Sequence, residues 1–351
     1  MNSKFEFPLV DKDRFHDACG IGFVATRSGK PESRILPLAV KALKKLSHRG
    51  AKSYDNNSGD GAGLMIDIPH SFFRKIIKDD QNLRLSRNEV LAVAVVFHSS
   101  KRHNLFDKLI FDLTKNDGIN FLLKREVPVN EEVLGEQSRK ERPNIYQYIF
   151  RADKRESKLL EKKIYLIRKK IEKKFISRKS KPYICSFSSK TMVYKGLMSS
   201  FQLDKFYFDL NQKLKIKMAI FHERFSTNTF SSWEMAQPFR MIAHNGEFNT
   251  IKGSRLWMNA REANLKSEFW GDEIKYLKPI ISKNGSDSES FDQVAEFLLN
   301  SGRNLFDLMM IMIPDSYNQI KKYYKNDLMS KKMKDYFIYH ENFMKPWDGP
   351  A

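Results

Sequence analysis

Apolar residues along the first hundred positions recur at spacings typical of strands and of one amphipathic helix. Ile21 to Ala25 is a short strand-like run, and from Ser33 to Leu46 the apolar positions lie three and four residues apart. That second spacing predicts a helix with one face toward a core. Leu64 to Ile68 and Val90 to Phe97 have the continuous apolar character of buried strands. The pattern therefore predicts strands and a helix that share one core.

The longest helical pattern runs from Ala152 to Phe175. Its apolar stripe comprises Leu160, Ile164, Ile167, Ile171 and Phe175, and much of the remaining circumference is filled by Lys162, Lys163, Lys169, Lys170, Lys173 and Lys174. A basic amphipathic helix can bind RNA or an anionic membrane. A solvated surface face is the commoner meaning of such lysines, and we expect that here.

The second half of the chain is dominated by strand-like segments. They are Tyr183 to Phe187, Thr191 to Tyr194, Leu214 to Phe221 and Phe239 to Ala243, and helical patterns return at Ser254 to Ala263 and Ser290 to Leu299. No internal repeat, low-complexity linker or sharp change in composition divides the 351 residues. The sequence therefore predicts one domain that mixes helices and strands and carries long insertions.

Composition indicates a globular intracellular protein. The chain is 41% apolar and 13% aromatic, and its two cysteines, Cys19 and Cys185, give neither a disulfide framework nor a metal-ligand pattern. The longest clearly apolar runs are too short to span a bilayer, and the first eighteen residues carry charges and lack the apolar segment of a secretory signal.

The net charge of +20 raises nucleic acid as a partner, because 62 Lys and Arg stand against 42 Asp and Glu. The lysines are spread along the whole chain, however, among many Ile, Asn and Phe residues. We interpret this excess as a compositional bias rather than as a binding surface.

Candidate chemistry begins at Cys19, which lies between small residues just before the first strand-like run. A free cysteine is most often a small buried hydrophobe. If the chain were cut after Ala18, however, the new α-amino group of Cys19 would lie within reach of its own thiol. An α-amine titrates near pH 8, roughly two units below lysine, so Cys19 would supply both nucleophile and base.

Three later segments offer groups that such a nucleophile would need. Phe221 to Thr229 places Arg224 and several hydroxyl groups at a strand end, where a guanidinium can hold a carboxylate through two hydrogen bonds, although a surface ion pair is the usual role. Asn245 and Gly246 form a pair that usually marks a hairpin turn. The same pair offers a side-chain amide and an unhindered backbone N–H to an oxyanion.

The third segment contains Asp287, which we expect just ahead of a helix. Capping is the usual role of an acidic residue there, and the helix end would also keep the carboxylate ionised and able to hold an ammonium group. Together the segments supply a thiol with its own amine, an oxyanion site, an arginine for a carboxylate and an aspartate for an amino group. An α-amino acid with a side-chain amide satisfies all of them, and glutamine is the obvious candidate.

At this point a family resemblance is evident. The chain resembles the N-terminal glutaminase domain of the glutamate synthase large subunit, a class II glutamine amidotransferase of the N-terminal-nucleophile hydrolase type. The resemblance is carried, in the family's order, by Ala18-Cys19-Gly20-Ile21-Gly22-Phe23, His48-Arg49-Gly50, Ser58-Gly59-Asp60-Gly61-Ala62-Gly63, Val193-Tyr194-Lys195-Gly196, Arg224-Phe225-Ser226-Thr227-Asn228-Thr229, His244-Asn245-Gly246-Glu247, Ser286-Asp287-Ser288 and Pro346-Trp347-Asp348-Gly349-Pro350-Ala351.

The resemblance implies an α+β fold, a four-layer αββα sandwich, in which residues 1–18 are a removed propeptide and residues 19–351 form the amidotransferase domain. It implies that Cys19 attacks the glutamine amide and that Asn245 and Gly246 hold the oxyanion. It further implies that Arg224, Asp287, Thr227 and Gly246 bind the substrate, and that no metal takes part.

Family members pass the ammonia through an internal tunnel to a synthase site that adds it to 2-oxoglutarate. The resemblance therefore implies FMN and an iron–sulfur cluster in synthase domains, and as partners those domains in cis or in trans and an electron-transfer subunit or ferredoxin. It implies neither membrane nor nucleic acid. The implied location is the cytoplasm, or an organelle stroma if the chain is organelle-encoded.

The sequence also departs from the family, whose members continue well beyond Trp347-Asp348-Gly349-Pro350. We therefore expect a domain that is incomplete at its C-terminal end and lacks one strand of the sandwich. Two cysteines cannot supply an iron–sulfur cluster, so no cofactor is expected in these residues.

Two alternatives remain at this stage. Another class II amidotransferase, such as an asparagine synthetase or a phosphoribosyl-pyrophosphate amidotransferase, would share the same residues. Those relatives place the arginine motif closer to the cysteine than the 205 positions that separate Cys19 from Arg224. The other alternative is a catalytically inactive basic binding protein built on the same fold.

Overall fold

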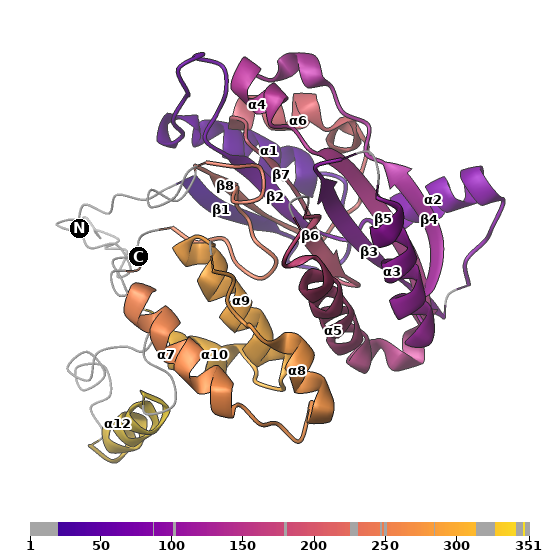
Figure 1. The fold of residues 1–351 in the computed structure, drawn as a ribbon. Coiled ribbons are helices and arrows are strands. Elements are labelled where there is room, and N and C mark those ends of the chain that lie inside the picture. The colour runs from indigo at the N-terminus through magenta and orange to yellow at the C-terminus, as the bar shows by residue number, and fades with distance from the viewer. Residues whose placement is uncertain are drawn as a thin grey trace, which may run out of the picture.

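Two antiparallel sheets, each of four strands, form the centre of the part of the chain that the structure describes (Figure 1). The structure is a computed structural model and describes residues 20–86, 88–100, 103–178, 181–224, 231–245, 248, 251–283, 285–313, 327–341 and 347. The first sheet has the order β1-β8-β2-β7 and the second β4-β5-β3-β6. The strands are β1 (Gly20–Ala25), β2 (Ala62–Asp67), β3 (Glu89–His98), β4 (Asn120–Glu126), β5 (Asn144–Asp153), β6 (Tyr183–Ser188), β7 (Thr191–Gly196) and β8 (Met218–Glu223).

Helices surround the two sheets. They are α1 (Ile35–Lys45), α2 (His70–Gln81), α3 (Asn104–Asn116), α4 (Glu136–Lys140), α5 (Ser157–Phe175), α6 (Ser200–Phe206), α7 (Ile251–Asn264), α8 (Ile274–Leu277), α9 (Asp287–Asn300), α10 (Leu305–Met312) and α12 (Asp327–Glu341). Apolar residues of α3 and α5 pack against one face of the second sheet, while α1, α2 and α6 share a core with the first sheet. The predicted α+β sandwich is therefore confirmed.

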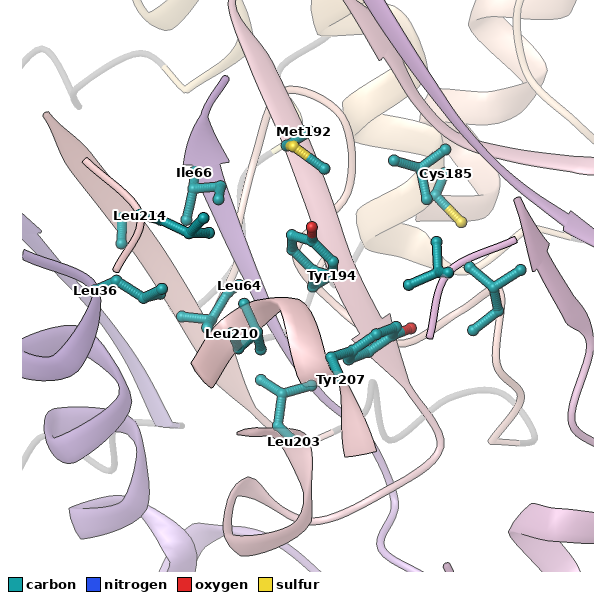
Figure 2. Close-up of a cluster of buried hydrophobic side chains, with 14 of the residues drawn as sticks. Leu36, Leu64, Ile66, Cys185, Met192, Tyr194, Leu203, Tyr207, Leu210 and Leu214 are labelled. Atoms are coloured by element: carbon teal, nitrogen blue, oxygen red, sulfur yellow. The ribbon is translucent and has the colours of Figure 1, made fainter. Parts of the chain in front are cut away.

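One apolar cluster joins the two sheets. Figure 2 shows part of it, with Leu64, Ile66, Met192 and Tyr194 of the first sheet, Cys185 of the second sheet and Leu36, Leu203, Tyr207, Leu210 and Leu214 from the helices and connections. Cys185 is fully buried in this cluster, and burial raises the pKa of its thiol to about 12. It is therefore a core residue and a poor nucleophile at neutral pH.

Most of the expected elements are present, and three need correction. The helix predicted from Ala152 begins only at Ser157, because Ala152 pairs with Val90 as part of β5. β8 begins at Met218 rather than at Leu214. No strand forms at 239–243, where Asp292 accepts hydrogen bonds from consecutive backbone N–H groups that a ladder would have used.

The sequence suggested that the lysines of α5 form a solvated face, but several of them make contacts within the fold. Four of them contact the segment that leads into α9, through Lys162 to the Phe269 carbonyl (2.7 Å), Lys169 to the Pro279 carbonyl (2.9 Å), Lys173 to the Lys275 carbonyl (2.6 Å) and Lys170 to the Glu273 carboxylate (3.2 Å). Backbone carbonyls outside regular structure need donors. The basic composition of this helix therefore has a structural role within the fold.

A buried network of charges ties α5 to α9. Arg168, 1% exposed, contacts Glu172 on its own helix and Glu296 on α9. Glu296 also accepts a hydrogen bond from Arg240 (3.3 Å), whose guanidinium lies 3.8 Å from Asp292. Each charge in the network is compensated by a neighbour, which is the condition for burying charges at all.

We predict that Arg168→Ala lowers the free energy of unfolding by about 3 kcal/mol or more, because Glu296 and Glu172 lose their cation while Glu296 stays buried. Chemical denaturation of purified protein measures it. Arg34→Ala, which breaks an exposed pair with Glu32, is the control and should change little. Equal effects of the two substitutions would contradict the compensating role of Arg168.

Candidate active site

The register of β1 and β8 brings Gly20 and Glu223, each next in sequence to an expected site residue, to the same end of the first sheet. Gly20, which follows Cys19, pairs with Glu223, which precedes Arg224. Because the strands are antiparallel, the chain enters β1 where it leaves β8 (Figure 1). Cys19 itself lies outside the described residues, as do Thr227 and Gly246.

Arg224 is held in an unusual backbone conformation as it leaves β8. Its φ angle is 96°, in a region that residues with a side chain rarely adopt, and its N–H donates to the Gly61 carbonyl (2.9 Å). Such strain persists only where the surroundings fix it, and it clusters at functional sites. The expectation that this arginine stands at a strand end is confirmed.

A chain of hydrogen bonds connects the three site segments. His222 Nε2 donates to the His244 carbonyl (2.9 Å), and His244 Nδ1 lies 3.1 Å from Ser288 Oγ. His222 is two residues before Arg224, His244 is the residue before Asn245, and Ser288 follows Asp287. Arg224, Asn245 and Asp287, which the sequence singled out, thus each lie within two positions of a residue in this hydrogen-bonded chain.

Both histidines of this chain are neutral at pH 7. Burial lowers the pKa of His222 to about 4, and burial likewise lowers the pKa of His244, against the opposing effect of the Asp287 carboxylate.

The His244 ring stacks on Phe248 (4.3 Å between ring centres), which in turn stacks on Phe291 of α9. The segment before Asn245 is therefore fixed by stacking as well as by hydrogen bonds.

Asp287 is the first residue of α9, whereas the sequence suggested that it lies just ahead of the helix. The cap is Ser286, whose hydroxyl accepts from the Glu289 N–H (3.0 Å), while an oxygen of Asp287 accepts from the Ser288 N–H (2.6 Å). Asp287 is buried, and the backbone N–H groups of the first turn favour its negative charge. Arg255 of α7 donates to the Gly285 and Ser286 carbonyls and so fixes the approach to the helix.

Sequence reasoning missed two residues that hold the 236–245 segment. Gln237 is buried and accepts from the His244 N–H (2.7 Å), while Asp292 accepts from the N–H groups of Met241 (2.7 Å) and Ile242 (3.1 Å). Gly63 leaves room for this segment, because a Cβ there would lie 2.4 Å from the Gln237 carbonyl oxygen. Nothing in the local sequence pattern distinguishes these residues from surface polar ones.

Asn245 was expected either in a hairpin turn or as an oxyanion donor. The residues before it, 239–244, contain no strand, so no hairpin strand leads into Asn245. Asn245 itself is half-buried at the end of the segment fixed by Gln237 and Asp292. Its use as an oxyanion donor stays a prediction.

Glu223 is a further carboxylic acid at this strand end, and the sequence gave no reason to select it. Its side chain is 1% exposed, and burial raises its pKa to about 7. A carboxyl group with a raised pKa binds its proton more tightly in the folded state than in the unfolded one. The raised pKa of Glu223 therefore stabilises the folded state fully below pH 4.5, which is its ordinary pKa. This stabilisation is lost as the pH rises through about 7.

We predict that the thermal unfolding midpoint of the wild type decreases relative to that of Glu223→Gln as the pH rises from 5 to 8. The glutamine side chain cannot ionise. Paired melting curves across this range measure the difference. Glu141→Gln, an exposed residue at the end of α4, is the control and should follow the wild type at every pH. Parallel curves for the wild type and Glu223→Gln would contradict the raised pKa.

Among the described residues no three His, Cys, Asp or Glu side chains are grouped so that they could hold a metal ion. The described helices include none with the length and apolar character to cross a membrane.

The chain is similar in sequence to a family of known proteins. The family described as "Glutamine amidotransferases class-II" matches residues 19–351. Similar proteins include the ferredoxin-dependent glutamate synthase of Pyropia yezoensis, 37% identical over 349 residues and 98% of this chain, and the glutamate synthase [NADPH] large chain of Bacillus subtilis, 39% identical over 341 residues and 96% of this chain. The glutamate synthase [NADH] of Saccharomyces cerevisiae is 38% identical over 98% of this chain.

The matched regions cover 22% of the first two relatives and 16% of the third. The chain thus spans about a fifth of the length of these curated relatives. Their names divide between ferredoxin, NADPH and NADH, so similarity assigns no single electron donor to this chain.

Proposed function

Because the chain belongs to the class II glutamine amidotransferases, we propose that it hydrolyses the side-chain amide of L-glutamine to glutamate and ammonia, with Cys19 as nucleophile. The observation that carries the proposal is the hydrogen-bonded chain His222, His244 and Ser288, next to the β1 and β8 strand ends. It supports one pocket built from segments that are far apart in the sequence.

The proposed nucleophile is the N-terminal residue of a processed chain, from which residues 1–18 have been removed. The α-amino group of Cys19 takes the thiol proton, and the sulfur attacks the carbonyl carbon of the glutamine side chain. The same amine then returns the proton to the departing nitrogen, so ammonia leaves and a glutamyl thioester remains. Water adds to the thioester, glutamate is released and the thiol is restored.

Asn245 and Gly246 are proposed to stabilise the negative oxygen of the tetrahedral intermediates. The Asn245 side-chain amide and the Gly246 N–H provide two donors for it. The neutral His222 and the clamp of Asp292 support this role, because they fix the preceding backbone before substrate arrives. A preorganised donor stabilises charge at no cost of reorganisation during the reaction.

Arg224 and Asp287 are proposed to bind the two ends of the amino acid. The guanidinium takes the α-carboxylate and the buried Asp287 carboxylate takes the α-ammonium, while Thr227 contributes a hydroxyl group. Opposite charges at fixed positions select a free amino acid over a glutamine residue within a peptide, because a peptide lacks both charges at that residue.

The ammonia is proposed to serve a glutamate synthase reaction with 2-oxoglutarate, in synthase domains that carry FMN and an iron–sulfur cluster and lie outside these 351 residues. The relatives named above support this proposal. The partners are those domains and an electron donor such as ferredoxin or a small electron-transfer subunit. We place the reaction in the cytoplasm, or in a stroma if the chain is organelle-encoded.

A glutaminase assay on the purified chain tests the proposal. Glutamate and ammonia should appear in equal amounts, and a glutamine-mimicking electrophile should stop both while it labels one residue. A chain that retains salt-sensitive DNA binding yet neither hydrolyses glutamine nor takes the label would instead support the inactive binding protein.

We predict that Ser288→Ala lowers kcat/KM for glutamine by about 10-fold or more. The substitution removes the hydroxyl group that contacts His244, so the position of Asn245 relative to Asp287 is less well fixed. Steady-state kinetics measures the change. Ser301→Ala, at the other end of α9 where the hydroxyl accepts from Trp270 Nε1 (2.7 Å), is the matched control and should leave kcat/KM within 2-fold, about the scatter of surface changes. Unchanged kinetics for Ser288→Ala would contradict the positioning role.

A further inference from the structure

Lys195 is a fully buried cation that the proposed reaction does not use. It lies on β7, and its Nζ donates to two neutral oxygens, the Glu234 carbonyl (2.7 Å) and the Tyr183 hydroxyl (3.2 Å). The same Nζ lies 4.7 Å from the centre of the Phe239 ring. Among the described residues no carboxylate is within ion-pair distance of it. Lysines are almost never fully buried unless they are paired, so this one needs an explanation.

Stability does not provide that explanation. Burial lowers the pKa of Lys195 to about 8, because a charged amine loses its hydration in the interior. The carboxyl groups of Glu289 and Asp292 on α9 favour the charged form, Arg240 opposes it, and burial outweighs them. At pH 7 the lysine is therefore charged, and the folded state loses free energy by keeping that charge away from water.

The strand pairing of the first sheet places Lys195 and His222 in one row across the strands. Lys195 of β7 is opposite Gly63 of β2, and Gly63 is opposite His222 of β8. Residues that are directly opposite in antiparallel strands have their side chains on the same face of the sheet. Lys195 and His222 therefore extend from the same face, one on each side of a glycine that has no side chain.

The segment 234–244 lies across this row and is held at both ends. Lys195 donates to the carbonyl of Glu234, the first residue of the segment, and His222 donates to the carbonyl of His244, the last (2.9 Å). Between these two anchors the segment meets the sheet at the glycine of the row, where a Cβ would lie 2.4 Å from one of the segment's carbonyl oxygens. The two side chains thus hold the segment on either side of its closest contact with the sheet.

The contacts of Lys195 lead directly to the proposed oxyanion donors. The Glu234 carbonyl and the Phe239 ring, which it contacts, lie on either side of Gln237 in the chain. Gln237 accepts from the N–H of His244 (2.7 Å), the residue before the proposed donor amide. A shift of the segment at Lys195 would therefore reach the donor amide through one buried side chain.

We propose that Lys195 is a positioning residue for the oxyanion donors. Its ammonium group fixes segment 234–244 on the sheet, so that Asn245 and Gly246 are in place before glutamine arrives. This inference rests on the proposed function, because it assigns the segment a role in that reaction. Oxyanion donors act on the transition state rather than on the bound substrate, so loss of Lys195 should reduce kcat and leave KM unchanged.

Lys195→Met tests this role, because methionine has a similar length and still packs against aromatic rings but has no N–H group. The substitution should lower kcat for glutamine by about 10-fold or more and change KM by less than about 2-fold. Alkylation of Cys19 by iodoacetamide, which needs the thiol but no oxyanion donor, should keep its wild-type rate. Lys190→Met, at an exposed lysine just before β7, is the matched control and should behave as the wild type in each assay.

The melting midpoint distinguishes positioning from a structural role. For Lys195→Met it should be no more than about 3 °C below that of the wild type, because removal of an unpaired buried charge offsets the lost hydrogen bonds. A variant that does not fold, or that loses kcat, substrate affinity and alkylation together, would assign Lys195 a structural role and overturn the proposal.

Hydrogen exchange measures how well the segment is fixed without any turnover. Three backbone amides within 241–244 donate to buried side chains, and they should exchange at least 10-fold faster in Lys195→Met than in Lys190→Met. Equal exchange in the two variants would overturn the inference even if the wild-type chain hydrolyses glutamine. Conversely, faster exchange in Lys195→Met of a chain that has no glutaminase activity would refute the proposed function and leave Lys195 as the anchor of the segment.

Discussion

Cys19→Ser should abolish covalent labelling by a glutamine-mimicking electrophile and lower glutamine turnover by about 10³-fold or more. A hydroxyl is far less acidic and less nucleophilic than a thiol at the same position. Loss of an activated nucleophile is among the largest effects that a single substitution has on an enzyme. Mass spectrometry of the labelled protein and a glutamate assay measure the two results.

Cys185→Ser is the matched control for this prediction. Cys185 is fully buried in the core between the two sheets, and burial raises the pKa of its thiol to about 12, so it should not react (Figure 2). The control variant should keep the label on Cys19 and retain turnover, provided that its melting curve shows it to be folded. A label that moves to Cys185, or turnover that survives in Cys19→Ser, would identify a different nucleophile.

Arg224→Lys and Asp287→Asn should each raise the KM for glutamine by about 100-fold. Lysine cannot reproduce the two parallel hydrogen bonds of a guanidinium to a carboxylate. Asparagine of the same size removes the charge that faces the substrate ammonium. Loss of one partner of a buried charged pair costs about 2–5 kcal/mol, which corresponds to this range. Steady-state kinetics on glutamine measures both variants.

A substrate without the α-amino group distinguishes the two roles. Glutaramate, which is glutamine without that group, should be a poor substrate for the wild type and should be affected by Arg224→Lys but hardly at all by Asp287→Asn. If Asp287→Asn harms glutaramate and glutamine equally, Asp287 acts by supporting α9, whose first turn it opens, and not by binding the ammonium group.

The elements with a clear period were predictable from the sequence. β1, β3, β6, β7 and α9 lie where the apolar spacing placed them, because each has one face or both in a core. The start of α5 was misplaced because Ala152 continues the apolar stripe of the helix by chance, while its backbone pairs with Val90 across the sheet. Periodicity reports burial, and it cannot report which partner takes the backbone hydrogen bonds.

The residues of the candidate site likewise divide into those that the sequence identified and those that it missed. Arg224, Asn245 and Asp287 were found because their side chains suit glutamine and because they stand in recognisable motifs. Gln237 and Asp292 were not, since their roles exist only through hydrogen bonds to backbone N–H groups: Gln237 accepts from His244, and Asp292 accepts from Met241, 51 residues earlier in the chain. Glu223 was missed for another reason: a charged residue at a strand end reads as exposed, whereas the structure buries it.

The central claim is that the mature chain begins at Cys19 and uses its own amine as the base. Intact-mass measurement and N-terminal sequencing of protein that is active on glutamine test it most directly. The account predicts a chain that lacks residues 1–18 and begins with cysteine. Active protein that retains Met1 would contradict it, because the α-amine of Cys19 would then be tied up in a peptide bond.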